Sequence, residues 1–130
     1  MAYTFEQLLV KELQATPAVT ALVGMRIYPQ AAPQGTTANY VTYEATVMPV
    51  QAHDGSGGLY RGRVSFLCHS ATYANAKATA AAISAALDGF RGTMQGVYVG
   101  ALLWEMEADA GFDDETRMHV VAVDFRVLYQ

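Results

Sequence analysis

Cysteine is almost absent from this sequence of 130 residues, which contains only Cys68. A single thiol cannot form an intramolecular disulfide, so a disulfide framework is excluded and a reducing compartment is indicated. Charged residues are also sparse, at 15% of the chain. Because the cores of protein interfaces are depleted in charge, this composition favours a chain whose surface is partly buried in an assembly.

Basic residues are too few for a general nucleic-acid footprint, since 8 Lys and Arg stand against 12 Asp and Glu. An acidic surface repels DNA phosphates, so DNA could pass the protein without adhering to it. Long apolar runs are missing as well. The opening MAYTFEQLL lacks the basic and apolar regions of a signal peptide, and no segment reaches the roughly 20 apolar residues of a membrane span. We therefore expect no membrane partner.

The stretch 59–89 predicts a strand followed at once by a helix. In LYRGRVSFLCH, apolar side chains alternate with Arg61 and Arg63, which is the period-2 pattern of a half-buried strand. In TYANAKATAAAISAALDG, the apolar residues step by three and four, as on one face of a helix. Thr72 is a plausible N-cap, and Gly89 lies where a left-handed C-cap belongs.

The rest of the chain predicts one domain over residues 1–130, with the element order α-α-β-β-β-α-β-β. This order is typical of an α+β fold in which helices pack on one face of an antiparallel sheet, with a mixed sheet as the alternative. The expected elements are helices at 4–15 and from Pro17, an extended segment at 26–29, strands at 40–48, 97–108 and 118–129, and loops at 30–39 and 109–116.

Residues able to carry chemistry do not form a known catalytic pattern. His53, His69 and His119 lack the spacing of zinc ligands. Cys68 and His69 are neighbours on a strand, so their side chains point to opposite faces. We therefore predict no enzyme, no metal and no cofactor, with a small hydrolase that uses an acidic pair as the catalytic alternative.

The densest charge cluster is acidic and lies around the loop at 109–116. Its spacing does not match a calcium-binding loop, so a solvated hairpin tip or an electrostatic role in an assembly is expected. The cluster consists of Glu105, Glu107, Asp109, Asp113, Asp114 and Glu115.

Arginines occupy the polar faces of two predicted strands. Arg61, Arg63 and Arg126 are either exposed sheet charges or partners in salt bridges across a subunit seam, with Glu44 or Asp124 as candidate carboxylates. Arginine suits such a seam because its planar fork binds a carboxylate through two hydrogen bonds.

The segment 51–58 is rich in glycine, which permits positive φ and little fixed structure. It is predicted to be a mobile connection or, alternatively, a loop that a partner orders. The residues of this hypothesis are His53, Asp54, Gly55, Ser56, Gly57 and Gly58.

Taken together, these features resemble a family of small tail-completion, or tail-terminator, proteins of long-tailed bacteriophages and phage-like particles. The resemblance covers most of the chain, and Asn39 departs from it, because the family often has proline there. The matching stretches are PAVTALVGMRIYP (17–29), APQGTTANYVTYE (32–44), HDGSGGLYRGRVSFLCHSATYANAKATAAAISAALDGFRG (53–92) and DDETRMHVVAVDFRVLY (113–129).

The resemblance implies a structural virion protein of the tail–neck region, assembled in the cytoplasm of the bacterial host. Its copies would form a ring, most simply a hexamer, which caps the tail tube, stops tube polymerisation and docks head-completion proteins. Double-stranded DNA would pass through the channel without specific binding. We further hypothesise that Arg61, Arg63, Asp124 and Arg126 help to form the subunit seam and that the acidic hairpin 105–115 faces the lumen or the tube rim. The loops 30–39 and 51–58 are expected to be mobile alone and to order against the tail tube or the neck.

Two other readings remain open at this stage. The chain could be another ring-forming subunit of the same particle, either a head–tail connector or a tail-tube protein. It could also be an unrelated soluble domain that dimerises or binds a ligand.

Overall fold

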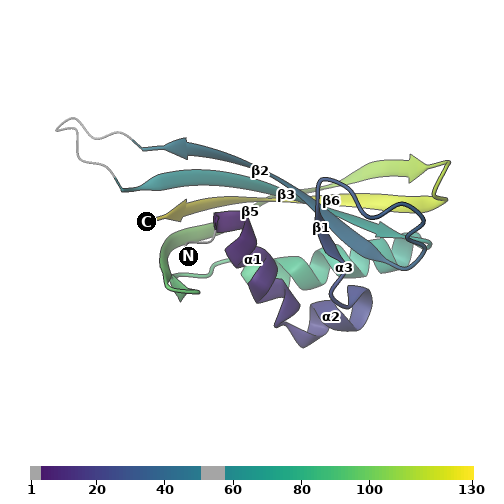
Figure 1. Cartoon of the computed structure of the whole chain (residues 1–130), viewed down its shortest axis with the longest axis horizontal. Coiled ribbons are helices and arrows are strands. Elements are labelled where there is room, and N and C mark those ends of the chain that lie inside the picture. The colour runs from purple at the N-terminus through teal and green to yellow at the C-terminus, as the bar shows by residue number, and fades with distance from the viewer. Residues whose placement is uncertain (1–3, 51–57) are drawn as a thin grey trace.

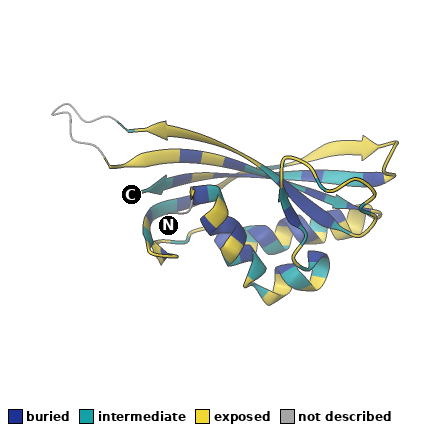
Figure 2. Ribbon diagram, in the orientation of Figure 1, coloured by how far each residue is buried: buried dark blue, intermediate teal, exposed yellow. Residues whose placement is uncertain are grey.

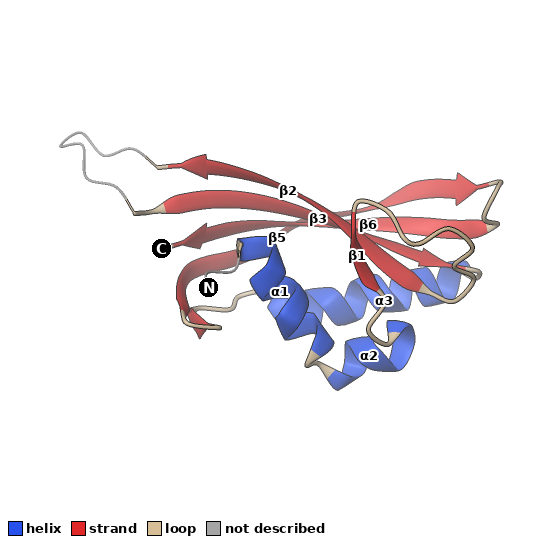
Figure 3. Cartoon of the chain, viewed as in Figure 1, coloured by secondary structure: helices blue, strands red, loops and turns tan. Residues whose placement is uncertain are grey.

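A computed structural model describes residues 4–50 and 58–130 and shows two layers, a sheet and a set of helices on one of its faces (Figures 1 and 3). The strand order in the sheet is β1-β2-β3-β6-β5-β4, with β1 parallel to β2 and every other pair antiparallel. The elements are α1 (Phe5–Gln14), α2 (Pro17–Val23), β1 (Ile27–Pro29), β2 (Tyr40–Pro49), β3 (Tyr60–Ser70), α3 (Tyr73–Leu87), β4 (Gly92–Met94), β5 (Val97–Asp113) and β6 (Met118–Tyr129).

The predicted α+β class and element order are confirmed, and the sheet is the mixed variant. The structure adds the short strand β4, where only a turn between Gly92 and Gly96 was expected. The acidic loop predicted at 109–116 is wrong, because β5 continues to Asp113 and pairs there with Met118 of β6. Register shifts after Trp104 and after Asp109 interrupt the alternation of side chains, which is why the pattern hid the second half of this strand.

Local capping signals act as their residue types predict. The Thr4 hydroxyl accepts a bond from the Gln7 amide at 3.4 Å, and the Gln7 side chain accepts one from the Thr4 amide at 3.0 Å, so α1 begins with a capping box. The Thr72 hydroxyl accepts from the Asn75 amide at 3.2 Å and caps α3. Gly89 adopts φ +80°, the left-handed conformation expected where that helix ends.

The core lies between the three helices and the sheet face that they cover, which we call the helix face. Phe66 of β3 and Phe125 of β6 meet there edge to face, with ring centroids 6.1 Å apart. The fully buried alanines of α3 let its backbone approach these rings. The side chains of α3 that lie fully buried against the sheet are Ala76, Ala80, Ile83 and Leu87.

The opposite side of the sheet, which we call the open face, is not covered by helices. Along β2 the residues are exposed from Glu44 onward, and along β5 nearly all are exposed from Leu103 onward (Figure 2). The exposed fractions of Met48, Leu103 and Met106 on this face are 48%, 46% and 47%. Apolar side chains of this size at half exposure are expected where another protein surface will cover them.

Gly62 of β3 marks the closest approach of α1 to the sheet. A Cβ atom at this position would lie 2.7 to 2.9 Å from three ring carbons of Phe5, which is itself buried. The Phe5 ring also stacks on Tyr129, with centroids 5.3 Å apart, so it has little room to move away. Because residue 62 has no side chain, the Phe5 ring at the start of α1 can pack directly against the backbone of β3.

Replacing Gly62 with alanine should lower the free energy of unfolding by about 1–3 kcal/mol, because the added methyl overpacks the Phe5 site. Urea denaturation followed by circular dichroism measures this change. Gly100→Ala is the matched control, since its Cβ would meet its nearest atoms at ordinary contact distances of 3.7 and 3.8 Å. Equal stability of the two variants would contradict the packing role of Gly62.

Candidate assembly surface

Three arginines gather on the open face, and we call them the arginine cluster: Arg61, Arg63 and Arg126. Positions 61 and 63 alternate along β3 with the buried Gly62 and Val64, so their side chains point away from the helices. In the register of β3 and β6, Arg126 lies directly opposite Arg63. Like charges at opposed positions repel, so this pair needs a negative partner.

Glu105 supplies that partner from β5. One of its carboxylate oxygens lies 3.6 Å from Arg63 Nη2, and the other lies 3.9 Å from Arg126 Nε. Glu105 is the extra residue at the register shift between Trp104 and Met106. Both arginine side chains are more than half exposed, so each pair contributes only about 0–1 kcal/mol.

Positive charge remains in excess at this site, although the whole chain carries a net charge of −4. Glu105 pairs with two of the three arginines, and among the described residues no carboxylate lies within ion-pair distance of Arg61. A groove of about 480 Å³ runs over the cluster. Its lining consists of Thr46, Met48, Arg61, Gly62, Arg63, Glu105 and Arg126. Arginine and methionine are both enriched at protein interfaces relative to the rest of the surface.

The two carboxylates proposed as seam partners occupy different environments. Asp124 is buried and accepts a hydrogen bond from the Ser65 hydroxyl, so its own chain satisfies it. Glu44 is exposed on β2, opposite the same Ser65. Neither carboxylate pairs with the arginine cluster within the chain. The sequence did not reveal Glu105 as the partner, because the register shift that turns its side chain to the open face is not visible in the alternation of apolar and polar residues.

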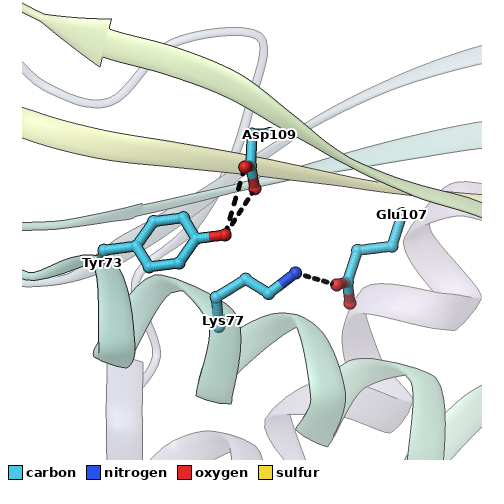
Figure 4. Close-up of polar contacts among 4 residues, drawn as sticks. All are labelled: Tyr73, Lys77, Glu107 and Asp109. Atoms are coloured by element: carbon cyan, nitrogen blue, oxygen red, sulfur yellow. Dashed lines mark hydrogen bonds and ion pairs between the residues drawn. The ribbon is translucent and has the colours of Figure 1, made fainter.

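The predicted acidic cluster is divided among three places. Glu105 pairs with the arginine cluster on the open face, whereas Glu107 and Asp109 face α3 (Figure 4). There Lys77 Nζ donates to Glu107, and the Tyr73 hydroxyl donates to Asp109 at 2.9 and 3.1 Å. These hydrogen bonds raise the pKa of Lys77 and of Tyr73. The contacts tie the first two turns of α3 to β5.

The third part of the acidic cluster is the turn between β5 and β6. The Asp113 side chain accepts bonds from the amides of Glu115, at 2.9 Å, and Thr116, at 3.4 Å, so it orders the turn. Asp114 and Arg117 form an exposed ion pair at 3.9 Å. This acidic tip is therefore a structured turn at the end of a long hairpin.

The predicted loops differ in what the structure describes of them. His53, Asp54, Gly55, Ser56 and Gly57 lie outside the described residues. Gly58 is exposed and adopts φ +101°.

The loop at 30–39 is anchored within the chain at its last residue, and its ordering against a partner stays a prediction. Arg26 Nε donates to the Asn39 carbonyl at 2.7 Å, and the Ser70 hydroxyl donates to the Asn39 side chain at 2.9 Å. Asn39, the residue that departs from the family pattern, thus accepts bonds through both its backbone and its side chain.

Cys68 and His69 lie on opposite faces of β3, as predicted. Burial raises the pKa of the Cys68 thiol to about 12. His69 stacks on Tyr40, with ring centroids 4.3 Å apart, and its Nε2 lies 3.0 Å from the Thr42 hydroxyl. Burial lowers the pKa of His69. Among the described residues, no three His, Cys, Asp or Glu side chains converge on a possible metal position.

The described helices include none with the length and apolarity required to cross a membrane. The most distinctive surface in the described part of the chain is instead an open sheet face with an arginine cluster and exposed methionines. Such a surface is typical of the class of proteins that assemble with other proteins.

Comparison with known proteins identifies the family. The model of the family "Tail completion protein gp17" matches residues 7–130, and the chain belongs to this family of structural proteins of phage tails. Its expected place in the tail region of a virion is thereby confirmed. Among curated proteins, no sequence matches the chain significantly.

Two solved structures share the fold. A chain described as "Virion of native gene transfer agent (GTA) particle" is 26% identical, with a TM-score of 0.74, and the match covers 96% of this chain and 93% of that one. A second structure is 16% identical, with a TM-score of 0.61 over 98% of this chain and 97% of that one, and it supports the fold alone.

We expect the Cys68 thiol to react with a disulfide reagent at least about a hundredfold more slowly in the folded protein than in denaturant. Its pKa rises from 9.0 to about 12, which leaves about a thousandfold less thiolate near neutral pH. Absorbance after addition of Ellman's reagent measures the rate. The control is Cys68→Ala with Thr116→Cys, whose thiol lies in the exposed turn and should react at once. Rapid labelling of native Cys68 would contradict its assignment as a core residue.

Proposed function

We propose that copies of this chain form a ring, most simply a hexamer, which caps the tail tube and ends its polymerisation. The partners are other copies of the chain, the tail-tube protein and a head-completion protein of the neck, and no cofactor is required. The observation that carries the proposal is the open face, where excess arginine and half-exposed methionines lie together in a tail-completion protein. The similarity to a chain of a gene transfer agent virion supports the same conclusion.

The arginine cluster is proposed as part of the subunit seam, together with Glu44 and Asp124. Arg61 is the member best placed to bind a carboxylate of another copy, since no described carboxylate pairs with it inside the chain. Glu44 is the better candidate acceptor of the two carboxylates, because it is exposed whereas Asp124 already binds Ser65. The segment from His53 to Gly58 stays a predicted contact for the tube or the neck.

The acidic tip at Asp113, Asp114 and Glu115 is proposed to face the lumen or the rim of the tube. Asp113 and Asp114 make contacts within the turn, and the ion pair of Asp114 with Arg117 neutralises one of the three carboxylates. The tip therefore keeps a net negative charge at the far end of the β5–β6 hairpin. Such charge repels DNA phosphates and lets double-stranded DNA pass without specific binding. Glu107 and Asp109 do not share this role, because they bind α3.

Reversing two charges in Arg61→Glu/Arg63→Glu should weaken ring assembly by at least about tenfold in the dissociation constant, because it places carboxylates where the seam needs cations. Size-exclusion chromatography with light scattering measures the mass. Arg91→Glu, which changes an exposed arginine on the loop after α3, is the matched control. An unchanged mass distribution would remove the arginines from the seam, and a filament in negative-stain images would indicate a tail-tube protein.

Neutralising the tip in Asp113→Asn/Asp114→Asn/Glu115→Gln should leave the ring mass unchanged and reduce the yield of infectious or gene-transferring particles. The amides keep the size of the side chains and remove the negative charge that repels DNA. Particle titre measures the effect, with Glu12→Gln on α1 as the control. A normal titre would exclude an electrostatic role for this tip.

A further inference from the structure

The sheet ends in two free backbone edges, and they lie at diagonally opposite corners. Strand β1 pairs only with residues 41–43 of β2, so in the described part of the chain β2 is unpaired on that side from Glu44 to Pro49. Strand β4 pairs only with residues 97–99 of β5, so within the described residues no strand lies beside β5 from Gly100 to Asp113. Free strand edges carry unpaired amide and carbonyl groups and are templates for pairing with another chain.

The direction of the free groups on β2 follows from its contacts with β1 and the following loop. The Val41 amide donates to the Arg26 carbonyl at 2.9 Å, and the Tyr43 carbonyl accepts from the Gln30 amide at 3.0 Å. Since successive residues of a strand point their backbone groups to alternate sides, Ala45 and Val47 also point outward. Pro49 occupies the next outward position, where proline costs no ladder bond.

The free groups on β5 are assigned in the same way. The Leu102 carbonyl accepts from the Gly89 amide at 2.8 Å, and the Trp104 amide donates to the Asp88 side chain at 2.9 Å. These two contacts occupy the first part of the edge. After the register shift at Glu105, residues 106–109 pair with β6 without interruption. In that run Glu107 and Asp109 alternate with the residues that bond to β6, so their backbone groups point outward.

Two common protections against pairing are missing along these runs, although Glu44, Glu107 and Asp109 carry negative charge there. No lysine or proline occurs in 44–48 or in 106–109. The side chains of Val47, Met48 and Met106 are 47%, 48% and 47% exposed, which is a large fraction for apolar residues on an edge. The register shifts and Pro49 flank the two runs and limit the pairing to about four residues.

We propose that residues 45–48 of β2 pair antiparallel with residues 106–109 of β5 in a second copy of this chain, so that the sheet continues from one subunit to the next. Because each copy offers two different edges, the contact is head-to-tail, and repeated contacts of this kind form a ring when the rotation between copies closes. The polarity fits. Strands β2, β3, β6 and β5 alternate in direction, so the β5 edge of one copy runs opposite to the β2 edge of the next.

The diagonal placement of the edges has a geometric consequence. Within one copy, Thr46 and Val47 are level with Arg126 and Val127 of β6, whereas residues 106–109 are level with β6 residues 124–121. Each copy must therefore be displaced along the strand direction by about four residues, or about 13 Å, relative to its neighbour. Across the sheet, the four strands of one copy span about 19 Å in total. That shift corresponds to a strand tilt of about 35°, which is the tilt at which sheets close into barrels.

The register that pairs Val47 with Glu107 and Ala45 with Asp109 also matches the two faces. All four side chains lie on the helix face, so the open faces of neighbouring copies become continuous. On the open face this register places Met48 opposite Met106 and Thr46 opposite Ala108. The methionine pair would then be covered by the contact that the edges make.

This inference rests on the proposed ring and is tested by removing one outward amide. Val47→Pro deletes a free amide on the β2 edge and leaves every bond between β2 and β3 in place. We expect the variant to lose the ring mass in light scattering while its circular dichroism spectrum is unchanged. Val47→Thr, which keeps the amide and the branched shape, is the matched control and should retain the ring.

A second measurement does not depend on the folding of the proline variant. Thr46→Cys and Ala108→Cys, mixed as two separate proteins under mild oxidation, should form a disulfide-linked dimer, since the opposed Cα atoms would lie about 4.5 Å apart. Each variant alone is the control and should remain uncrosslinked, with Cys68 buried in both. Rings that persist in Val47→Pro, or that form without this crosslink, overturn the edge pairing and leave the proposed ring intact. A wild-type chain that stays monomeric overturns both.

Discussion

The structure depends on the packing of one helix, α3, against the helix face of β3 and β6. Alanines at 76 and 80 bring the helix backbone close to the sheet, and Ile83 and Leu87 fill the space beside them. Burying each large apolar side chain contributes about 1.5–3 kcal/mol. α1 and α2 complete the layer, and α1 can approach β3 because Gly62 has no side chain under Phe5. The helices thus bury the middle of one face of the sheet, and they leave the open face uncovered.

The helices cover only part of the sheet, and this difference in extent creates the surfaces of interest. β2 and β3 run past the helices at one end of the sheet, and β5 and β6 reach their hairpin turn at the other (Figure 1). Both projecting regions expose apolar residues and backbone edges, whereas an isolated domain would normally shorten or protect them. A protein of the tail completion family can keep such edges because it functions inside an assembly.

Charge on this molecule is sorted by role rather than spread evenly. Glu107 and Asp109 hold α3 to β5, Glu105 balances two arginines on the open face, and Asp113 orders the hairpin turn. Arg61 and Glu44 have no ion-pair partner among the described residues, and both lie on the open face near the β2 edge. Sparse charge in the composition therefore corresponds to a few carboxylates and guanidinium groups with defined positions.

The sequence by itself determined the α+β class, the cap at Thr72, and the alternation that separates Arg61 and Arg63 from the buried side of β3. These features depend on neighbours a few residues apart, so a pattern can reveal them. Only the tertiary structure decided that Glu105 joins the arginine cluster, that β5 extends to Asp113, and that the two free edges lie at opposite corners. Each of these depends on a strand register, which is set by packing between residues distant in the chain and by bulges that leave no local signature.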